Sequence, residues 1–405
     1  MTTPTNMYTH AQRKEEHLRY LGELRVTEQR WASYLPWLKS LGYDLRPRYQ
    51  PGWKASWLTS GIGAFESEDA LLPNVYGKVM DAKRLSDGRV VALKLLPTHR
   101  KELPILTYLS SAPLRADPRN HSVPLLDVHP LPDTDEEVLA VMPLLVYFDR
   151  PPFETIGEIL LCIYTYLEGL VFLHEHNIAH LDICAANALQ DPGTELFPKG
   201  FHPARPTYYV LKPGTLKIRG NPPHTSRTLS PVNYHFIDFG ESIKFESLES
   251  RKLIYGTVGH DLDVPEFAGG AADRGYDPFR LDIRAFGDMI KVEMYEEYHG
   301  SEILKPLIEA MCRDIPEERP EAVESLEILK GIISSQTPET LAAFARQRKV
   351  YSASYRVKQY HRHRWELQLM GRPPIYPSIP GLEVQPPRPL SFFFRTLTRL
   401  RLLIS

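Results

Sequence analysis

The sequence predicts a fold of the α+β class, with a small β-rich N-terminal part and a larger, mainly helical C-terminal part. Three observations predict it. Short apolar runs separated by turn residues fill residues 74–145. One apolar run of helical length then covers residues 155–176. From residue 280 onward, apolar residues recur at helical spacings of three and four. Strands followed by helices along the chain are typical of this class.

The first 57 residues combine a helical pattern with a cluster of tryptophans. Leucine and aromatic residues recur at helical spacing over residues 8–41, and Pro36 should kink or restart that helix. Four of the five tryptophans lie within 27 residues, at Trp31, Trp37, Trp53 and Trp57. They would form either an aromatic surface for a partner or a helix and loop clamped onto the main domain. We favour the clamp because aromatic rings bury large areas.

The next segments read as strands with one short helix. Residues 74–97 predict two strands joined by a turn at Asp87-Gly88, a pair that favours hairpins. A short helix is expected over residues 101–111. The apolar runs 123–128 and 138–145 have the length of buried strands.

The C-terminal part is expected to be helical around one long irregular segment. The apolar run 155–176 predicts a long helix, and no internal repeat is present. Residues 188–234 are rich in proline and predict loops, with a hairpin over 208–220 that turns at Pro213-Gly214. Helices are expected over residues 282–299, 304–312 and 321–333.

Composition excludes several classes of protein. The chain has 405 residues, of which 42% are hydrophobic and 24% charged, so wholesale disorder is excluded. Its 36 prolines predict many long loops. The three cysteines, Cys162, Cys184 and Cys312, are too scattered for a disulfide scaffold or a cysteine zinc cluster. They favour a reducing compartment, the cytoplasm with the nucleus as the alternative.

The net charge of −2 conceals an acidic body and a basic tail. Residues 341–405 carry 12 basic and 2 acidic side chains, whereas residues 1–340 carry 36 basic and 48 acidic ones. Anionic membrane and nucleic acid are alternative partners for this tail. We favour a solvated extension. No window reaches the ~18 apolar residues of a membrane span, so no transmembrane segment is expected. The polar start also lacks the apolar run of a secretory signal.

A series of polar residues follows one another in a specific order. Lys94 interrupts an apolar strand, and a buried lysine is costly unless it is paired. The later members come in this order: Glu102, His180-Leu181-Asp182, Asn187, Asp238-Phe239-Gly240, Pro265-Glu266, Asp282 and Arg319.

This order resembles the protein-kinase superfamily over roughly residues 70–335. The tryptophan-rich block with GYDLRPRYQPGW also resembles a fungal protein-kinase-like family. The resemblance implies a bilobal kinase-like fold, divided as follows: an N-terminal extension over 1–69, an N-lobe over about 70–145, a C-lobe over about 146–335 with a long insert at about 190–232, and a basic extension over 336–405.

The resemblance implies roles in phosphate and metal chemistry. Lys94 would orient the α and β phosphates of ATP, and Glu102 would pair with it. Asp238 and Asn187 would give oxygen ligands to Mg²⁺, as a hard cation requires. Asp182 would orient the acceptor hydroxyl and take its proton. The catalytic residues are therefore expected to be Asp182, Lys94 and Asn187, and the cofactors ATP and Mg²⁺.

The resemblance also implies an adenine pocket and structural contacts. Met142 would lie at the back of the pocket. The other expected nucleotide contacts are Gly77 and Val79 before the lysine strand, Ala92 within it, and Pro143, Leu144 and Leu145 as the hinge. Of the structural residues, His180 and Phe239 would pack in the core, Glu266 and Arg319 would form a buried ion pair, and Asp282 would brace the catalytic loop.

The sequence departs from the kinase pattern at several phosphate-handling positions. Leu72 and Asn74 stand where the first two glycines of the phosphate loop belong, and Leu181 replaces the usual arginine. Cys184 stands where Ser/Thr kinases carry lysine, and Ala186 where many tyrosine kinases carry arginine. Losing a charge that stabilises the transition state costs orders of magnitude in rate.

Two functions follow. One is an ATP-dependent protein kinase acting on Ser/Thr hydroxyls of a protein substrate. The alternative is a pseudokinase, a nucleotide-binding or purely scaffolding module that acts through a signalling partner. The retained Lys94, Asp182, Asn187 and Asp238 favour the enzyme. For the long insert, gating of substrate, partner binding and disorder all stay open.

Overall fold

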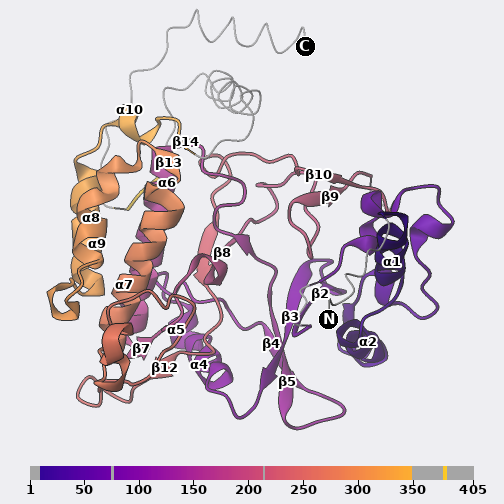
Figure 1. Cartoon of the computed structure of the whole chain (residues 1–405), viewed down its shortest axis with the longest axis horizontal. Coiled ribbons are helices and arrows are strands. Elements are labelled where there is room, and N and C mark those ends of the chain that lie inside the picture. Colours follow the sequence, from indigo (N-terminus) through magenta and orange to yellow (C-terminus); the bar gives the residue numbers. More distant parts are fainter. Residues whose placement is uncertain (1–9, 74–76, 213–214, 349–376, 381–405) are drawn as a thin grey trace, which may run out of the picture. The chain divides into compact units, whose positions relative to one another are not determined.

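The computed structural model describes residues 10–73, 77–212, 215–348 and 377–380. The chain forms two compact units, and neither is continuous in sequence (Figure 1). The first unit comprises Met1–Arg100, Leu125–Leu145 and Phe197–His224. The second comprises Lys101–Pro124, Val146–Leu196 and Thr225–Ser405. The predicted mixture of sheet and helix is confirmed at the level of fold class.

The first unit is built on an antiparallel sheet with strand order β1-β2-β3-β5-β4. Its elements are α1 (His10–Gly22), α2 (Val26–Ser33), α3 (Leu35–Ser40), β1 (Tyr43–Asp44), β2 (Val79–Arg84), β3 (Val90–Pro97), β4 (Asp127–Pro130), β5 (Glu137–Pro143), β9 (Tyr208–Val210) and β10 (Ile218–Gly220). The hairpin predicted over residues 74–97 is confirmed by β2 and β3, in which Val79 lies opposite Lys94.

The side chains of β3 alternate between two faces of the sheet. Val91, Leu93 and Leu95 are buried, whereas Ala92 and Lys94 share the other face and are half-buried. This period of two explains why a lysine can interrupt an apolar strand, since its face is not the one that packs in the core. Ala92 in turn lies opposite Met142 on β5.

The predicted N-terminal helix is present as three helices rather than one. α2 begins with a capping box, in which the backbone N–H of Arg25 donates to the carboxylate of Glu28 over 3.1 Å. Pro36 lies in the first turn of α3, where proline is tolerated, so the chain restarts there. Trp31 is wholly buried and belongs to one core cluster with Leu93 of the sheet. For Trp31, the interpretation as a clamp is therefore confirmed.

Part of the long insert folds against this first unit. β9 and β10 pair antiparallel, as predicted, although the turn residues 213–214 lie outside the described residues. The backbone N–H of Glu68 donates to the carbonyl of Leu216 over 2.7 Å, and the carboxylate of Glu68 lies 2.9 Å from the His202 ring. Within its described residues, this part of the insert has a defined fold, so disorder is the wrong interpretation there.

The second unit is mainly helical. Its elements are α4 (Glu102–Leu109), α5 (Ala112–Arg115), β6 (Val146–Tyr147), α6 (Ile156–Glu175), β7 (Ile178–Ala179), β8 (Ala188–Asp191), β11 (Asn233–Phe236), β12 (Ile243–Lys244), α7 (Pro278–Ile290), β13 (Tyr298–His299), α8 (Lys305–Met311), α9 (Ala322–Ser334), α10 (Pro338–Leu341) and β14 (Arg346–Gln347). α6 packs against α9, and α7 packs against α8 (Figure 1). The predicted helices over residues 101–111, 155–176, 304–312 and 321–333 are confirmed.

α6 is the core helix of this unit. The Thr155 hydroxyl caps it by accepting a hydrogen bond from the Glu158 N–H at 3.1 Å. By length and composition alone, α6 is long and apolar enough to cross a membrane, although no transmembrane segment was expected from the sequence. Of its apolar 18-residue window, however, 83% is buried inside the structure, as in the core helix of a globular domain.

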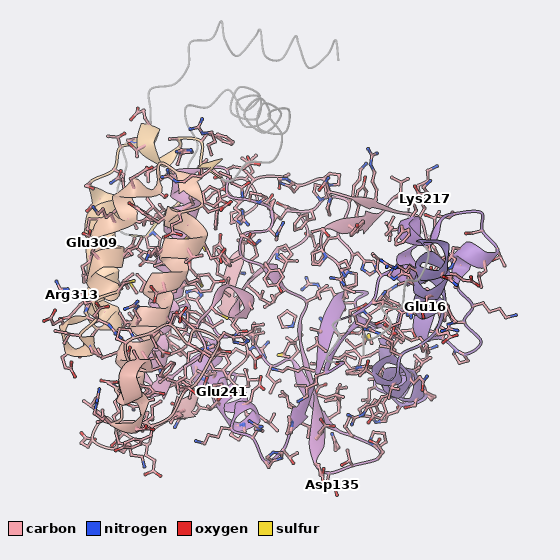
Figure 2. All side chains as sticks on the ribbon, in the orientation of Figure 1. Glu16, Asp135, Lys217, Glu241, Glu309 and Arg313 are labelled. Atoms are coloured by element: carbon pink, nitrogen blue, oxygen red, sulfur yellow. The ribbon has the colours of Figure 1, made fainter. Side chains whose placement is uncertain are left out.

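The surface of this unit carries charged side chains, of which Glu309 on α8 and Arg313 just beyond it are exposed (Figure 2). The described start of the C-terminal extension belongs to the same unit, since β14 pairs with β13. Ile379 is also buried. Most of the basic tail lies outside the described residues, and so do the interpretations made for it.

Candidate active site

The loop that carries Asp182 runs from β7 to β8 in the second unit and is fixed by Asp282. This wholly buried carboxylate on α7 accepts the backbone N–H groups of His180, at 2.8 Å, and Leu181, at 2.7 Å. The ring of His174 on α6 lies 3.0 Å from it. Leu181 has a φ of 66°, a left-handed conformation that a leucine seldom adopts without such support. The predicted bracing role of Asp282 is confirmed.

His180 is wholly buried and holds the loop from the other side. Its Nε2 lies 3.1 Å from the carbonyl oxygen of Ile237, and the backbone N–H of Asp182 donates to its Nδ1 over 3.3 Å. Burial lowers the pKa of this imidazole, so it is neutral, with Nε2 donating and Nδ1 accepting. The ring of Phe239 packs against it with centroids 4.9 Å apart. The predicted packing of these two rings is confirmed.

Asp182 and Asn187 lie in direct contact. The Asn187 side-chain amide donates to the Asp182 backbone carbonyl over 2.9 Å and to its Oδ2 over 2.8 Å. Both side chains are nearly buried, at 7% and 5% exposure. The two hydrogen bonds use the amide nitrogen of Asn187, so its carbonyl oxygen is the atom suited to a hard cation.

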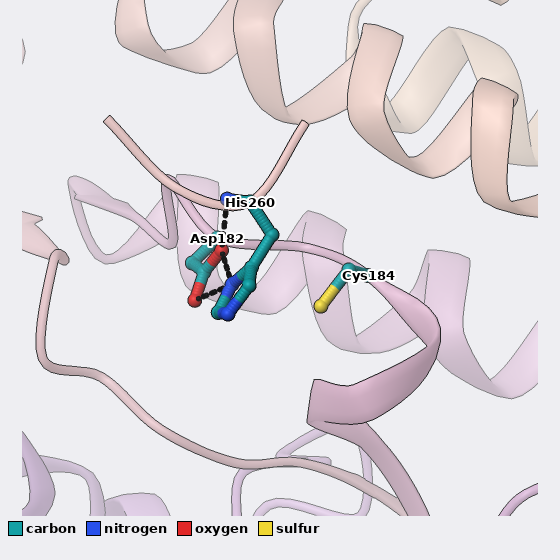
Figure 3. Close-up of side chains that lie close together, drawn as sticks. All are labelled: Asp182, Cys184 and His260. Carbon is teal, nitrogen blue, oxygen red and sulfur yellow. Dashed lines mark hydrogen bonds and ion pairs between the residues drawn. The ribbon is translucent and has the colours of Figure 1, made fainter. Parts of the chain in front are cut away.

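A second loop lies on the Asp182 carboxylate. The backbone N–H of His260 donates to Oδ1 over 2.8 Å, and the His260 Nδ1 lies 2.7 Å from Oδ1 and 2.9 Å from Oδ2 (Figure 3). The hydrogen bond with Asp182 raises the pKa of His260. Gly259 permits this approach, with a φ of +73°, since a Cβ there would meet the Leu181 carbonyl oxygen at 2.5 Å.

Asp238 follows β11 and comes close to the same loop. The N–H of Ile237 donates to the backbone carbonyl of Asn187 over 3.0 Å, at the end of the paired strands β8 and β11 where the two expected magnesium ligands lie. Asp238 has a φ of 61°. A Cβ added to Gly240 would lie 3.3 Å from the Asp238 carboxylate and 3.8 Å from that of Glu102, so both carboxylates border this glycine.

Glu266 and Arg319 form the buried ion pair that the resemblance implied. The side chains are 1% and 0% exposed, and the Arg319 Nη2 donates to Glu266 Oε2 over 3.1 Å. Arg319 also donates to the carbonyls of Arg313, at 2.7 Å, and Arg280, at 2.9 Å. This pair anchors the segment that ends the His260 loop.

The nucleotide contacts expected in the N-lobe lie in the first unit. Lys94 and Ala92 share one face of β3, and Met142 is buried on β5. Pro143 ends β5, followed by half-buried Leu144 and Leu145, and Val79 begins β2 with an exposed side chain. Lys94 and Glu102 belong to different units, so their pairing stays a prediction.

Gly77 is packed against the N-terminal extension. A Cβ there would come within 2.4 Å of the Thr27 Cβ, and the Trp31 indole N–H donates to the Gly77 carbonyl over 2.7 Å. The glycine is therefore needed for close contact with α2. Asn74, the other position discussed for the phosphate loop, lies outside the described residues.

The structure thus brings together the expected site residues Asp182, Asn187, Asp238 and Glu102 within the second unit. Sequence reasoning missed the contribution of Gly259 and His260. A glycine–histidine pair six residues before Pro265-Glu266 has no spacing that points to Asp182, because the contact joins residues 78 positions apart.

The chain is similar to a known protein kinase over part of its length. It is 30% identical to the cyclin-dependent kinase B2-1 of Arabidopsis thaliana in an alignment 154 residues long, which covers 33% of this chain and 48% of that protein. The chain therefore spans about half the length of that kinase. No protein-family model matches the chain. The similarity indicates a protein-kinase-like relationship. The mixed fold, with its antiparallel sheet, is compatible with that relationship.

Proposed function

We propose that this protein is an ATP- and Mg²⁺-dependent protein kinase with a bilobal fold, which transfers the γ-phosphoryl group to a Ser or Thr hydroxyl of a protein substrate. One observation carries the proposal: the Asn187 amide donates to the carboxylate of Asp182 within the loop that Asp282 braces. The spacing His-x-Asp-x-x-x-x-Asn is that of a kinase catalytic loop, in which aspartate accepts the substrate proton and asparagine binds Mg²⁺.

The residues present fit a magnesium ion. Mg²⁺ prefers oxygen ligands, and Asp238 and Asn187 offer a carboxylate and an amide oxygen. The hydrogen bond from Ile237 to Asn187 holds the chain beside both residues, where Asn187 precedes β8 and Asp238 follows β11. When bound, the ion would neutralise charge on the phosphates. The chain would orient the acceptor hydroxyl with Asp182 and accept its proton on the carboxylate.

Residues of the first unit would make the remaining contacts with the nucleotide. Lys94 would hold the α and β phosphates, in a position kept by Glu102. Met142, Ala92 and Val79 would surround the base. The hinge residues Pro143, Leu144 and Leu145 would meet the edge of the base through their backbone groups.

Phosphate transfer from labelled ATP tests the proposal. With Mg²⁺ and generic protein substrates, the purified full chain should label itself or a substrate. Asp182→Asn should lose that activity by several orders of magnitude. Asp263→Asn is the matched control, because this exposed aspartate lies in the His260 loop but outside the proposed site. Equal activity of the Asp182→Asn variant and the unchanged chain would refute the enzymatic proposal.

A pseudokinase is the second candidate, and the contact of His260 with both oxygens of Asp182 favours it. A general base whose carboxylate is occupied cannot take a proton from a substrate until the loop moves. The packing of Gly77 against Thr27 also commits the remaining phosphate-loop glycine to a structural contact.

Thermal shift measurements distinguish the two functions from a pure scaffold. A ligand present at 100 times its Kd adds about 2.7 kcal/mol to the free energy of unfolding. A shift with ATP and Mg²⁺ but no phosphate transfer would support a nucleotide-binding pseudokinase. No shift at all would leave a scaffold that acts through its surface.

A further inference from the structure

Three side chains that can ligate a metal ion lie close together at the catalytic loop. Asp182 and Cys184 stand two residues apart on that loop, and His260 reaches them from the second loop (Figure 3). Each offers one ligand atom: a carboxylate oxygen, a thiol sulfur and a ring nitrogen. All three atoms lie within 4.8 Å of one another.

We propose that Asp182, Cys184 and His260 form a site for a divalent transition metal ion of the zinc type, which holds the His260 loop on the catalytic loop. In a tetrahedral site, zinc lies about 2.0–2.3 Å from its N, O and S ligands, so neighbouring ligand atoms are roughly 3.3–3.8 Å apart. Here the three atoms lie within 4.8 Å of one another and the His260 and Asp182 atoms are 2.7 Å apart, so shifts of roughly 1 Å or less bring them to that range.

The ligand chemistry selects the class of metal. A thiolate and an imidazole are softer ligands than Mg²⁺ accepts, and both suit Zn²⁺ or Co²⁺. This site therefore differs in its ligand atoms, and in the metal that they prefer, from the magnesium site proposed at Asn187 and Asp238. Three protein ligands leave a fourth position for water, as in open zinc sites.

The loop geometry allows the ion to enter. The His260 side chain is 69% exposed, and its Nδ1 lies 2.7 Å from the Asp182 Oδ1. A metal ion between these two atoms requires them to separate by about half an ångström. The exposed ring can make this move. Binding releases the thiol proton of Cys184 to solvent, because the thiolate is the ligand, and the ring nitrogen of His260 that ligates the ion gives up its proton to solvent while the other ring nitrogen keeps or takes one.

The consequence for catalysis rests on the proposed function. A zinc ion bound here is coordinated by an oxygen of Asp182 and holds the His260 loop over the Asp182 carboxylate. Asp182 can then accept no proton from a substrate, so bound zinc inhibits phosphate transfer. Binding of the metal itself depends on no catalytic activity and is tested separately.

Cobalt titration of the reduced, metal-free full chain tests the site without nucleotide or substrate. One equivalent of Co²⁺ should produce a thiolate-to-cobalt charge-transfer band in the near ultraviolet, which Zn²⁺ then removes. Cys184→Ser should abolish the band. His260→Gln should weaken cobalt binding at least tenfold, since even loss of an outer-shell partner costs about 10- to 100-fold.

Cys312→Ser is the matched control, because Cys312 is also half-buried and Cys162 is wholly buried. It should keep the band. Histidines elsewhere, such as His361 and His363, cannot produce a thiolate band. Circular dichroism of metal-free Cys184→Ser should match the unchanged chain. The site is refuted by absence of a band in the unchanged chain, by its persistence in Cys184→Ser, or by equal loss in both cysteine variants.

A second measurement addresses inhibition. Zinc should lower phosphate transfer by the unchanged chain and have at least tenfold less effect on Cys184→Ser, each compared with its own zinc-free rate. If the unchanged chain transfers no phosphate, the proposed function fails while the cobalt band still decides the metal site. Equal inhibition of both proteins would refute the inhibitory role.

Discussion

Arg319 donates hydrogen bonds to both carboxylate oxygens of Glu266, and neither side chain is more than 1% exposed. A buried guanidinium stays charged, so its partner must stay charged too. The two residues are 53 positions apart and join the end of the His260 loop to the segment before α9. The pair therefore fixes one end of the loop that lies on Asp182.

Removing one charge of this pair should be costly. Glu266→Gln leaves Arg319 as an uncompensated buried charge and should lower the free energy of unfolding by about 3–5 kcal/mol. Glu327→Gln is the matched control, since its exposed pair with Lys330 should contribute less than about 1 kcal/mol. Urea unfolding measures both. A change below 1 kcal/mol for Glu266→Gln would contradict this account.

Gly259 should not tolerate a side chain. In Gly259→Ala, the Cβ meets a backbone oxygen that cannot turn away, and the φ of +73° disfavours alanine. We expect a loss of about 1–3 kcal/mol in stability. Gly331→Ala, in open space on α9, should instead stabilise by about 0.5–1 kcal/mol. Thermal unfolding separates the two, and opposite signs are expected. Equal effects would show that the His260 loop is not held closely.

The insert should depend on His202 for its attachment to the first unit. His202 is 2% exposed, and its Nε2 lies 2.9 Å from the carboxylate of Glu68. His202→Leu removes that partner, and a lost buried hydrogen bond costs about 1–3 kcal/mol. Limited proteolysis should then cleave residues 203–224 faster. His99→Leu, at an exposed position of the same unit, should be cleaved at the rate of the unchanged chain. Equal rates for both variants would argue against the attachment.

His235 should make the second unit sensitive to mild acid. Burial, followed by the nearby His121, lowers its pKa to about 4, while Asp191 opposes the shift. The folded chain keeps this ring neutral, whereas the unfolded chain binds a proton below its pKa of about 6.5. Stability is therefore complete above pH 6.5 and falls as the pH drops toward 4.

Urea unfolding at pH 7 and pH 5 measures this effect. The linkage predicts a loss of roughly 2 kcal/mol at pH 5 from this one group, because each unit of pKa difference is worth 1.36 kcal/mol. His235→Gln has no such proton to bind and should show a smaller difference between the two pH values. An unchanged difference would mean that other groups cause the acid sensitivity.

Local patterns predicted the elements that depend on local chemistry. The apolar run of α6 and the Asp87-Gly88 turn between β2 and β3 each depend on a short stretch of consecutive residues. Both elements were predicted from that stretch and are present in the structure. The break between α1 and α2 was missed because Arg25 is not a usual capping residue, although its N–H is accepted by Glu28. For the candidate site, the order of motifs identified Asp182 and Asn187, which contact each other, and Asp282, which accepts the backbone N–H groups of the preceding residues His180 and Leu181.

Contacts that neither a local pattern nor the order of motifs contains could not be predicted from the sequence. His260 contacts Asp182 across 78 positions, and His202 contacts Glu68 across 134. No periodicity or turn signal encodes such a pairing, since it depends on where folded elements carry the two segments. The hairpin of the insert was predicted, but its attachment to Glu68 was missed for the same reason.

The division of the chain between the two units also affects how the protein is made. The chain passes from one unit to the other five times, and the first unit needs residues as late as His224. At about 5–20 residues per second, a ribosome takes roughly 10–45 s to synthesise that far. The first unit is therefore completed only after its last hairpin, β9 and β10, has emerged, when two stretches of the second unit have already been synthesised. The nascent chain cannot complete one unit before starting the next.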